Sequence, residues 1–420
     1  MHNVFFIFNA AERYFMNDRT ISICEANAIY KNSSTCDAPS ICEIYQERER
    51  RFLSNHGCSS SDAGPRFREE SVCSIRTPFQ LDRDRIVYSN AFRRLKHKTQ
   101  VFLSPLGDHY RTRLTHTLEV SEIARNIARA MRLNEDLAEA IALGHDLGHT
   151  PFGHGGETAL KEIFSRNFSH NAQSLRVVDK LEKRGEGLNL TYQVRDGILK
   201  HSKGFGDILP STPGNTALTV EGKIVRIADI IAYLNHDLDD ALRSKVITES
   251  EIPPICKHQL GKTHSERART MMQDIISNSG ERNSFGDKHN KEENSNYGDG
   301  INAKDNCDTI RTKNENFVLY MGEATYSAMT ILRQFLYEKV YRAPSVHQEF
   351  VKAKKVLIEL YNHFMSDVDF LQTELEKMEM APWDPSKNSL ERSVCDIIAS
   401  MTDRYALELY TRLFFPRPRV

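Results

Sequence analysis

Residues 113–157 are RLTHTLEVSEIARNIARAMRLNEDLAEAIALGHDLGHTPFGHGGE, and this stretch decides the fold. Its apolar residues recur at helical spacing, first from Val120 to Met131 and again from Leu137 to Ala142. Asn134 separates the two stripes and suits an N-cap, because its side-chain oxygen can accept from the unpaired N–H groups of a following helix. The stretch therefore predicts two consecutive helices, the second ending near Gly148.

Three potential metal ligands lie on the inward side of these helices. His116 precedes Val120 by one turn and shares its face, and His145 and Asp146 stand at the end of the second helix. Imidazole and carboxylate together suit a divalent first-row metal, and carboxylates also admit magnesium or manganese. Adjacent His and Asp side chains diverge on an ideal helix, but they can bind one ion, or a pair, where the backbone turns at a helix end. A fourth ligand must come from elsewhere.

Asp229 is the best candidate for that ligand. Residues 223–242, KIVRIADIIAYLNHDLDDAL, predict a third helix with an apolar face. Asp229, Tyr233 and Asp237 recur every four residues and form a second, polar stripe. A carboxylate and a Tyr on a mostly apolar helix indicate a polar pocket beside the core.

Each of these residues has a more ordinary explanation when taken alone. A lone inward His such as His116 is usually a hydrogen-bonded core residue, a single His-Asp pair is a weak signal, and Asp229 alone fits a buried, hydrogen-bonded carboxylate. A His, a His-Asp pair and an Asp on three successive helices are much less expected by chance. The combination favours a metal centre.

The rest of the chain is also predicted to be helical. Helical patterning covers Leu81 to Lys98, Leu114 to Leu242 and Tyr320 to Leu413, and no strand-like alternation of any length appears. Residues 278–314 are dominated by Asn, Asp, Lys, Glu, Ser and Gly. Such a segment buries too little apolar surface to offset its ordering entropy, so we expect a disordered insertion.

We therefore expect an all-α protein with one domain. Residues 1–42 form an unassigned N-terminal extension, residues 43–277 the core, and residues 315–420 a C-terminal helical part of the same domain. A chain of 420 residues is long enough to bury a full-sized core.

The composition excludes several classes of protein. The formal net charge of -1 gives no field over the whole molecule for nucleic acid or a membrane surface, and a mean hydropathy of -0.51 favours a soluble protein. Residues 1–16 lack the basic leading region of a signal peptide, and the eight cysteines are scattered without a CxxC pair. We expect reduced thiols and a cytoplasmic location. The basic run FRRLKHK, residues 92–98, lacks interleaved aromatics, which favours a phosphate-facing or solvated helix.

Three segments resemble one known family. HDLGHTPFGHGGE, residues 145–157, is similar to the metal segment of bacterial deoxyguanosinetriphosphate triphosphohydrolases, which belong to the HD-domain superfamily. Residues 82–120, DRDRIVYSNAFRRLKHKTQVFLSPLGDHYRTRLTHTLEV, and residues 395–410, CDIIASMTDRYALELY, resemble the same family. The resemblance runs from about residue 47 to residue 416, apart from the insertion. It implies an HD-domain helical bundle with additional C-terminal helices.

The resemblance also assigns roles to residues. His116, His145, Asp146 and Asp229 match the family's metal ligands, and His154 and Glu157 match its catalytic His and Glu. The residues that resemble its substrate contacts are Gln100, Val101, Arg113, His149, His170, Tyr233 and Asp237.

The implied reaction is hydrolysis of a deoxynucleoside triphosphate, dGTP or another, to the deoxynucleoside and tripolyphosphate. The ion would be Mg²⁺ or Mn²⁺, although this ligand set also admits Fe, Co or Ni. Arg113, His149 and His170 would neutralise the phosphates, and His154 would protonate the departing 5'-oxygen, with Glu157 fixing the tautomer of His154 and raising its pKa. Relatives assemble as homo-oligomers, and some respond to a nucleotide or single-stranded DNA effector.

Two other functions remain open from the sequence. The four ligands alone would also suit an HD phosphohydrolase acting on another nucleotide, or a sensor that binds a nucleotide without turnover. His149, His154 and His170 also fit solvated histidines of a Gly-rich loop, Tyr233 fits plain core packing, and Arg113 fits a surface charge. Ile230 departs from the vertebrate relative, which has a phosphate-binding lysine after the metal-binding Asp; another basic residue would then have to replace that lysine.

Overall fold

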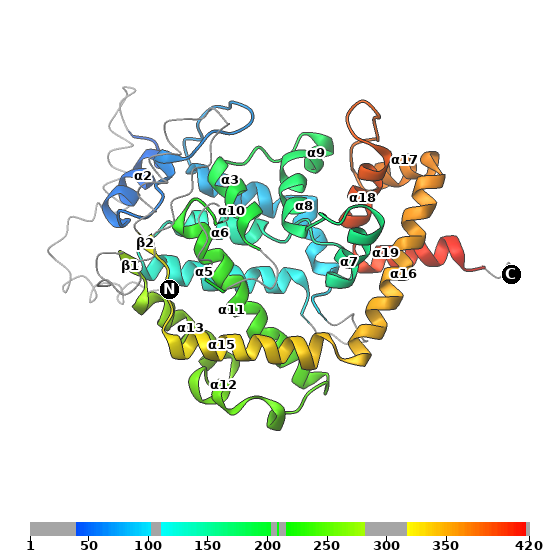
Figure 1. The fold of residues 1–420 in the computed structure, drawn as a ribbon. Helices are drawn as coiled ribbons and strands as arrows, with labels where there is room; N and C mark the ends of the chain where they lie inside the picture. Colours follow the sequence, from blue (N-terminus) through cyan, green and yellow to red (C-terminus); the bar gives the residue numbers. More distant parts are fainter. Residues whose placement is uncertain (1–38, 102–110, 203–207, 210–215, 282–316, 417–420) are drawn as a thin grey trace, which may run out of the picture.

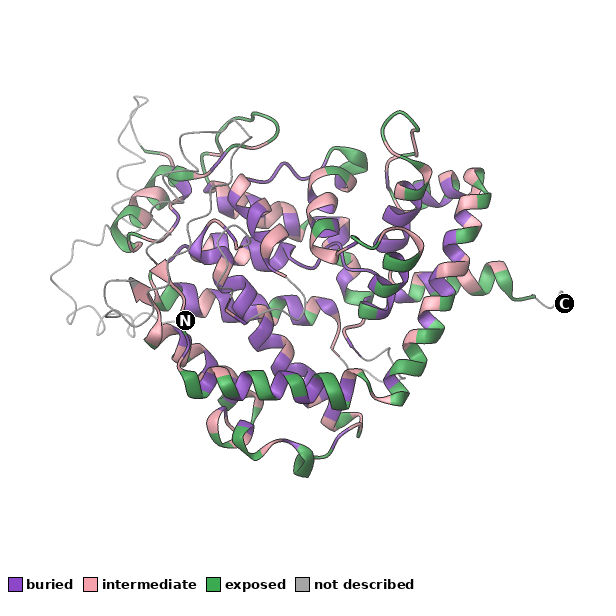
Figure 2. Cartoon of the chain, in the orientation of Figure 1, coloured by how far each residue is buried: buried purple, intermediate pink, exposed green. Residues whose placement is uncertain are grey.

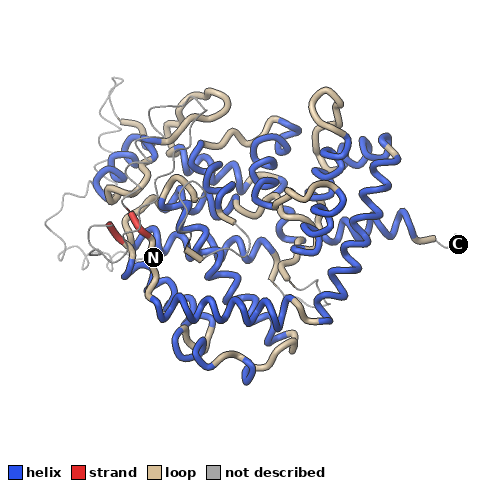
Figure 3. Tube along the Cα trace, viewed as in Figure 1, coloured by secondary structure: helices blue, strands red, loops and turns tan. Residues whose placement is uncertain are grey.

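The computed structural model describes residues 39–101, 111–202, 208–209, 216–281 and 317–416. The expected N-terminal extension and the expected insertion lie almost entirely outside the described residues. The expectation of an all-α fold is confirmed: helices dominate the trace in Figure 3, and its strands are two short ones. No helix in the described ranges is long and apolar enough to cross a lipid bilayer.

The chain up to Arg243 contains the central helices and those next to them. They are α2 (Ile41–Phe52), α3 (Pro78–Val87), α4 (Asn90–Arg94), α5 (Arg113–Ala130), α6 (Glu135–Gly144), α7 (Gly153–Ile163), α8 (His170–Arg176), α9 (Glu182–Gly185), α10 (Tyr192–Lys200) and α11 (Val220–Arg243). Single turns of other helix types occur at Ser60–Asp62, Leu95–His97 and Val177–Leu181.

The second half adds the outer helices. They are α12 (Pro254–Gln259), α13 (His264–Asn278), α15 (Glu323–Leu336), α16 (Pro344–Ser366), α17 (Val368–Lys377), α18 (Leu390–Ser400) and α19 (Asp403–Phe414), with further turns at Glu249–Glu251 and Tyr337–Tyr341. Strands β1 (Gly280–Glu281) and β2 (Phe317–Val318) pair antiparallel.

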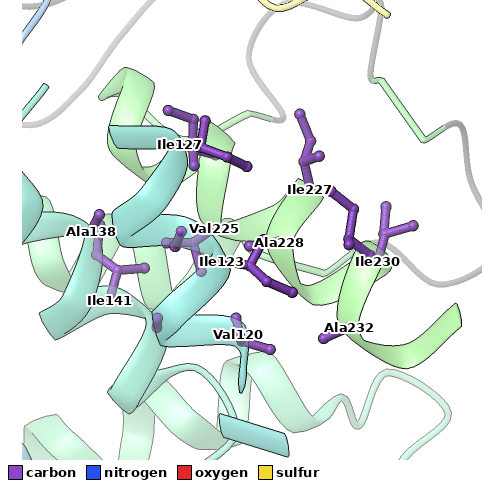
Figure 4. Close-up of a cluster of buried hydrophobic side chains, with 14 of the residues drawn as sticks. Val120, Ile123, Ile127, Ala138, Ile141, Val225, Ile227, Ala228, Ile230 and Ala232 are labelled. Atoms are coloured by element: carbon purple, nitrogen blue, oxygen red, sulfur yellow. The ribbon is translucent and has the colours of Figure 1, made fainter. Parts of the chain in front are cut away.

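The helices α5, α6 and α11 form the centre of the molecule (Figure 1). Their facing apolar side chains interlock, as Figure 4 shows for Val120 and Ile123 of α5 against Val225 and Ala228 of α11. In Figure 2 buried residues gather at this centre, while the outer sides of α15 and α16 are exposed. The three predicted site-bearing helices are therefore fixed against one another by one continuous core.

Local capping explains where the central helices begin. Asn134 caps α6 by accepting from the backbone N–H of Leu137 at 3.1 Å, so this cap prediction is confirmed. Thr112 caps α5 with a capping box to Thr115. These caps set the register in which α5 and α6 present their inward faces.

The prediction of one helix over Leu81 to Lys98 was wrong. The chain breaks at Ser89, whose hydroxyl accepts from the N–H of Phe92 at 3.1 Å and donates to the carbonyl of Ile86 at 2.7 Å. Glu182 accepts from the next two backbone N–H groups, at 3.1 and 2.8 Å. A serine that caps a new helix and a carboxylate from a distant segment together override the helical periodicity.

The C-terminal helices surround a second apolar cluster. It includes Phe152, Leu160 and Phe168 from the α7 region and side chains of α16 to α19 such as Leu360 and Ile397. The segment that follows the His-Asp pair is thus packed between the central helices and the C-terminal ones. Within the described ranges, Cys42, Cys73, Cys256 and Cys395 form no disulfide.

Candidate active site

The four candidate metal ligands lie together, brought from three helices. Nε2 of His116, on α5, lies 3.1 Å from Oδ1 of Asp229, on α11, and 4.0 Å from Oδ2 of Asp146. Nε2 of His145, at the end of α6, lies 3.7 Å from Oδ1 of Asp146 and 4.0 Å from Oδ1 of Asp229. His116, His145 and Asp146 are buried, while the Asp229 side chain is 21% exposed. Four donor groups therefore share one small, nearly dry volume.

The orientation of His145 is fixed by the end of its own helix. Its Nδ1 lies 2.6 Å from the carbonyl oxygen of Ala142. Because a carbonyl only accepts, Nδ1 carries the proton and Nε2 has a free lone pair. That Nε2 is buried and has no hydrogen-bond partner. An unpaired buried acceptor that faces two carboxylates fits a bound cation.

The orientation of His116 depends on a histidine that the sequence analysis did not single out. Nδ1 of His116 lies 2.8 Å from Nε2 of His236, and Nδ1 of His236 lies 2.8 Å from Oδ1 of Asp237, although the angle of this second contact is poor for a hydrogen bond. A proton on Nδ1 of His236 leaves its Nε2 to accept from His116. Nε2 of His116 then presents its lone pair to the carboxylates. Outer contacts of this kind hold metal-binding imidazoles in place.

The two carboxylates stay ionised. Burial alone would raise the pKa of Asp146, but Arg113 and three nearby histidines hold it well below its usual range. Burial likewise opposes ionisation of Asp229, and the neighbouring His116, His145 and His201 hold its pKa below the usual range. Anionic oxygens and unprotonated imidazole nitrogens are the forms that bind a metal.

The loop after the His-Asp pair depends on glycine. A Cβ on Gly148 would lie 2.1 Å from the backbone nitrogen of Ser174, and one on Gly156 would lie 2.0 Å from the carbonyl oxygen of Pro151. Phe152 adopts a left-handed conformation, with φ of 61°, and its N–H donates to Asp403 at 2.9 Å. The close backbone contacts at the two glycines and the hydrogen bond from Phe152 to Asp403 bend the chain. This bend brings α7 next to the metal ligands.

Four further predicted residues form a cluster beside the metal ligands: His149, His154, Glu157 and His170. The rings of His149 and His170 stack with centroids 4.8 Å apart, and His149 and His154 meet edge to face at 5.9 Å. Burial and Arg113 hold the pKa of His149 well below its ordinary value. His154 is exposed within the pocket, yet partial loss of water around its ring and the charge of Arg113 lower its pKa as well.

Glu157 does not bond to the histidine that we expected. Its Oε2 accepts from Nδ1 of His170 at 2.9 Å, and its Oε1 lies 2.7 Å from Nζ of Lys161. Burial opposes protonation of His170, but Glu157 outweighs it and raises the pKa of His170. The expected support of the His154 tautomer by Glu157 is therefore absent, because the fold places α8 closer to this carboxylate.

The candidate substrate contacts line a single pocket of about 940 Å³. Arg113 lies at its floor, where Nη1 donates to Oδ2 of Asp146 at 2.6 Å. Gln100 and Val101 form part of the wall, and Oε1 of Gln100 is buried without a partner. Tyr233 also lines the pocket, and Asp237 accepts from the hydroxyl of Tyr341 at 2.5 Å. Of all predicted site residues, His145 alone does not reach the pocket surface.

Several wall residues escaped the sequence analysis. The C-terminal helices contribute Arg333, Tyr337, Tyr341, His347, Phe350 and Lys354. Arg333, Tyr337 and Tyr341 recur every four residues, a signal that indicates one helix face without saying what it faces. His201, buried at the end of α10, also lies among the ligands, with its ring centroid 4.9 Å from that of His145. Its position after Val194 and Ile198 at helical spacing was a signal that it points inward.

The position after the metal-binding Asp, on α11, supplies no basic residue, and the basic residues of the pocket come from other helices. Ile230 is buried and contributes no charge, while Lys161, Arg333 and Lys354 line the pocket. None of residues 92–98 lines the pocket, and only part of this basic run is exposed. Lys98 is buried and donates to the carbonyls of His149 at 2.5 Å and Ala399 at 2.8 Å, and burial lowers its pKa well below the ordinary value.

Comparisons with known proteins agree with this geometry. Residues 113–234 match the model of the HD domain, and residues 319–412 match that of the phosphohydrolase-associated domain. A protein of Desulfatibacillum aliphaticivorans is 56% identical over 90% of this chain and 99% of its own length. Others from Caldanaerobacter subterraneus (46% identical; 90% of this chain, 96% of its own length) and Geobacter sulfurreducens (39%; 89% and 97%) are similar over most of both chains.

All three relatives carry the name deoxyguanosinetriphosphate triphosphohydrolase-like protein. HD domains depend on a metal, and the cluster of His116, His145 and Asp146 fits that dependence. The identity across nearly the whole chain places the protein among hydrolases. The chain belongs to the deoxyguanosinetriphosphate triphosphohydrolase-like family of HD-domain proteins.

Proposed function

We propose that this enzyme hydrolyses deoxynucleoside triphosphates, dGTP among them, to the deoxynucleoside and tripolyphosphate. One observation carries the proposal: three of the four candidate metal ligands, the cluster of histidines and a buried arginine line one pocket of about 940 Å³, with His145 beside them. That volume suits a ligand of nucleotide size. The names of the relatives support the same substrate class.

The cationic and imidazole groups are arranged to bind phosphates. Arg113 is held in place by Asp146 at 2.6 Å, and its Nε is buried with no hydrogen-bond partner. Lys161 and Lys354 lie at the wall on α7 and α16. Fixed cationic donors at the position where negative charge gathers stabilise a phosphoryl-transfer transition state without reorganisation.

The metal would be held by His116, His145, Asp146 and Asp229, with Mg²⁺ or Mn²⁺ preferred and Fe, Co or Ni admitted by the ligand set. When bound, a divalent ion polarises a phosphoryl oxygen and lowers the pKa of a coordinated water. The protein's own contribution is to orient the two imidazoles, as the contacts of His145 with Ala142 and of His116 with His236 do.

His154 is the proposed donor of a proton to the departing 5'-oxygen. Its ring is exposed inside the pocket, so a bound substrate can reach it. Its pKa is lowered, first by desolvation and then by Arg113. A polyanionic triphosphate beside it would favour the protonated ring and offset both effects. The charge of Glu157 raises the pKa of His154 and so opposes part of this shift, while its oxygens bind His170 and Lys161.

The deoxyribose would lie against Gln100, Val101, Tyr233 and Asp237. Oε1 of Gln100 is buried and unpaired, which leaves an acceptor for a sugar hydroxyl. Asp237 already accepts from Tyr341, so a 3'-hydroxyl would join an existing hydrogen-bond network. Burial and the neighbouring carboxylates raise the pKa of Tyr233, which keeps its hydroxyl neutral.

A product assay tests the proposal. The purified protein is incubated with Mn²⁺ or Mg²⁺ and each of the four dNTPs or GTP, and the products are separated by ion exchange. We expect a deoxynucleoside and tripolyphosphate, with turnover abolished by EDTA and by Asp146→Ala and unaffected by Asp369→Ala, a change at an exposed carboxylate on α17. Release of phosphate or pyrophosphate would indicate a phosphohydrolase that cuts another bond. Nucleotide binding without turnover would indicate a sensor.

A further inference from the structure

Lys98 contacts the main chain of two candidate phosphate-binding residues. Its carbonyl oxygen accepts from the N–H of Arg113 at 2.9 Å, and its Nζ donates to the carbonyl oxygen of His149 at 2.5 Å. A second hydrogen bond from Nζ, at 2.8 Å, reaches the carbonyl oxygen of Ala399 at the end of α18. Arg113 and His149 line the pocket, while Lys98 does not. Lys98 therefore lies behind the pocket wall and joins two elements that form it.

Thr99 and Gln100 contact the same loop at two further points. Asp403 accepts from the N–H of Thr99 at 3.0 Å with one carboxylate oxygen and from the N–H of Phe152 at 2.9 Å with the other. The carbonyl oxygen of Gln100 lies so close to Gly153 that a Cβ there would be 2.4 Å away. Three consecutive residues, 98–100, are therefore joined to the loop between residues 149 and 153, directly or through one carboxylate.

The side chain of Lys98 is buried, with 1% exposure. A neutral amine has two N–H groups and an ammonium group has three, so Nζ can serve both carbonyl oxygens in either protonation state. Burying this polar group costs free energy, which an apolar side chain of the same length would avoid. The two hydrogen bonds return little net stability, because all of these groups also bond to water in the unfolded chain. What the lysine provides is a fixed position for the two carbonyl groups.

The position of the His149 backbone determines where a cluster of imidazoles lies. The ring of His149 stacks on that of His170 and meets that of His154 edge to face, with centroids 4.8 and 5.9 Å apart. Besides burial, the charge of Arg113 lowers the pKa of His149 and of His154, so the guanidinium lies near both rings. A shift of the loop relative to α5 would change the distances between these groups. A misplacement of about 1 Å in such a set can lower a rate about 10²-fold.

We propose that Lys98 is a positioning residue, which holds the loop at His149 in place against Arg113 so that both can bind the triphosphate together. The proposal rests on the proposed function in taking these groups as contacts of a nucleoside triphosphate. Lys98 acts through them, because its own side chain does not line the pocket. Its loss should therefore lower the rate of the reaction and the affinity for polyphosphate, beyond any effect on stability.

Three variants of the full chain test the proposal. Lys98→Met keeps a flexible apolar stem but removes every N–H of the side chain. Lys98→Gln keeps two N–H groups on a stem that is shorter by one bond. The matched control is Arg66→Met, because Arg66 is a largely buried cation outside the pocket lining that donates to the carbonyl oxygens of Asn189 at 2.6 Å and Pro78 at 3.1 Å.

Each variant is measured at saturating Mn²⁺ and well below its melting temperature, with circular dichroism to establish that it is folded. Steady-state kinetics with the preferred dNTP give kcat and KM, and inhibition by inorganic tripolyphosphate reports on the phosphate contacts alone. We expect kcat to fall about 10²-fold in Lys98→Met and about 10-fold in Lys98→Gln, and the inhibition constant of tripolyphosphate to rise about 10-fold in Lys98→Met. Arg66→Met should melt at a lower temperature with wild-type kcat and inhibition constant.

Wild-type kcat in a folded Lys98→Met protein would overturn the proposal and leave Lys98 as a structural contact only. Equal losses of kcat in Lys98→Met and Arg66→Met would also overturn it, since general loosening of the fold would explain both. If Lys98→Met does not fold, wild-type kcat in Lys98→Gln is the result that overturns it. A wild-type chain that releases other products would refute the proposed function, and the kcat values of the variants for that other reaction would still decide the role of Lys98.

Discussion

Single side chains decide the chemistry, and His154 is the one whose role is most directly testable. Replacing His154 by Asn should lower kcat about 10²- to 10⁴-fold, the usual effect of removing a general acid, and change KM only a few-fold. The residue is exposed in the pocket, so the fold should tolerate the change. Steady-state kinetics with the preferred dNTP provides both constants.

The control is His258→Asn, because His258 is an exposed histidine on α12 outside the pocket lining. It should leave both constants unchanged. A His154 variant with wild-type kcat would mean that another residue donates the proton. His170 would then be the next candidate, because Glu157 raises its pKa.

At this scale the sequence supplied most of the site. The periodicity of three apolar helices was enough to direct His116, Asp146 and Asp229 inward. The partner of Glu157 was not predictable, since it depends on how α8 packs beside α7, which no local pattern encodes. His236 was missed for a related reason: a buried histidine next to a candidate substrate residue has no periodic signal of its own.

At the scale of elements, α19 positions the loop that carries His149 and leads into α7, the helix of His154. Asp403, in the first turn of α19, accepts from the N–H of Phe152 at 2.9 Å and from the N–H of Thr99 at 3.0 Å. Asp403→Ala should destabilise the protein by about 2–3 kcal/mol, because two largely buried N–H groups lose their partner, and it should also lower kcat. Urea unfolding and kinetics measure the two effects.

Asp369→Ala is the matched control, since Asp369 occupies the first turn of α17 and is exposed. It removes a comparable interaction with a helix N-terminus and should cost less than about 1 kcal/mol. Equal losses in the two variants would mean that Asp403 acts only as a first-turn acid of its helix.

A protonated histidine links α13 to both α5 and α11. His264 lies 2.6 Å from Glu119 and 2.9 Å from Asp239, and these hydrogen bonds raise its pKa from 6.5 to about 9. A folded-state pKa above the unfolded value stabilises the fold fully below about pH 6.5, and this contribution disappears as the pH rises through about 9. Its size should be about 1–3 kcal/mol, reduced by the partial exposure of the ring.

Urea unfolding at pH 6, 7.5 and 9.5 measures this contribution. The free energy of unfolding of wild-type protein should fall with pH more steeply than that of His264→Gln, and the two curves should converge at pH 9.5. Arg267, which also contacts Asp239, and Arg111, near Glu119, stay charged across this range. Parallel curves would show that His264 is not protonated in the folded protein.

Helix existence was easier to predict than helix ends. Central helices α5, α6 and α11 follow their apolar stripes closely, since their faces pack on one another. The segment from Leu81 to Lys98 carries a similar pattern, yet it breaks at Ser89 because Glu182 binds the backbone of the next turn. A contact that joins positions far apart in sequence leaves no trace in a local window.

At the scale of the whole molecule, the C-terminal helices complete the pocket of the HD domain. Arg333 and Phe350 close its wall, and Lys98 joins the loop at His149 to the end of α18 through Ala399. The helical pattern of the sequence predicted helices there and a single domain, but not that these helices face the site. That relation depends on packing between distant segments, here the cluster around Phe152 and Leu160.

The segment between β1 and β2 can be tested for a role in the fold. Glu281 pairs with Phe317 in an antiparallel register, so the two residues that flank 282–316 are paired with each other. Replacing residues 282–316 by Asn-Gly, the favoured two-residue hairpin turn, should preserve both strands. Loop shortening reduces the entropic cost of closure, so stability should be unchanged or higher by about 1–2 kcal/mol, with wild-type kcat.

Differential scanning fluorimetry, urea unfolding and the product assay measure the outcome, and a variant with residues 282–316 in shuffled order serves as the control. If both variants match the wild type, the polar composition of the segment makes no contribution to the core or the pocket. Loss of turnover in the excised variant alone would show that turnover needs a segment of this length. Loss of turnover in both variants would show that it needs the particular sequence of the segment. Either loss would contradict the expectation that a stretch so poor in apolar residues is an insertion without a part in the fold.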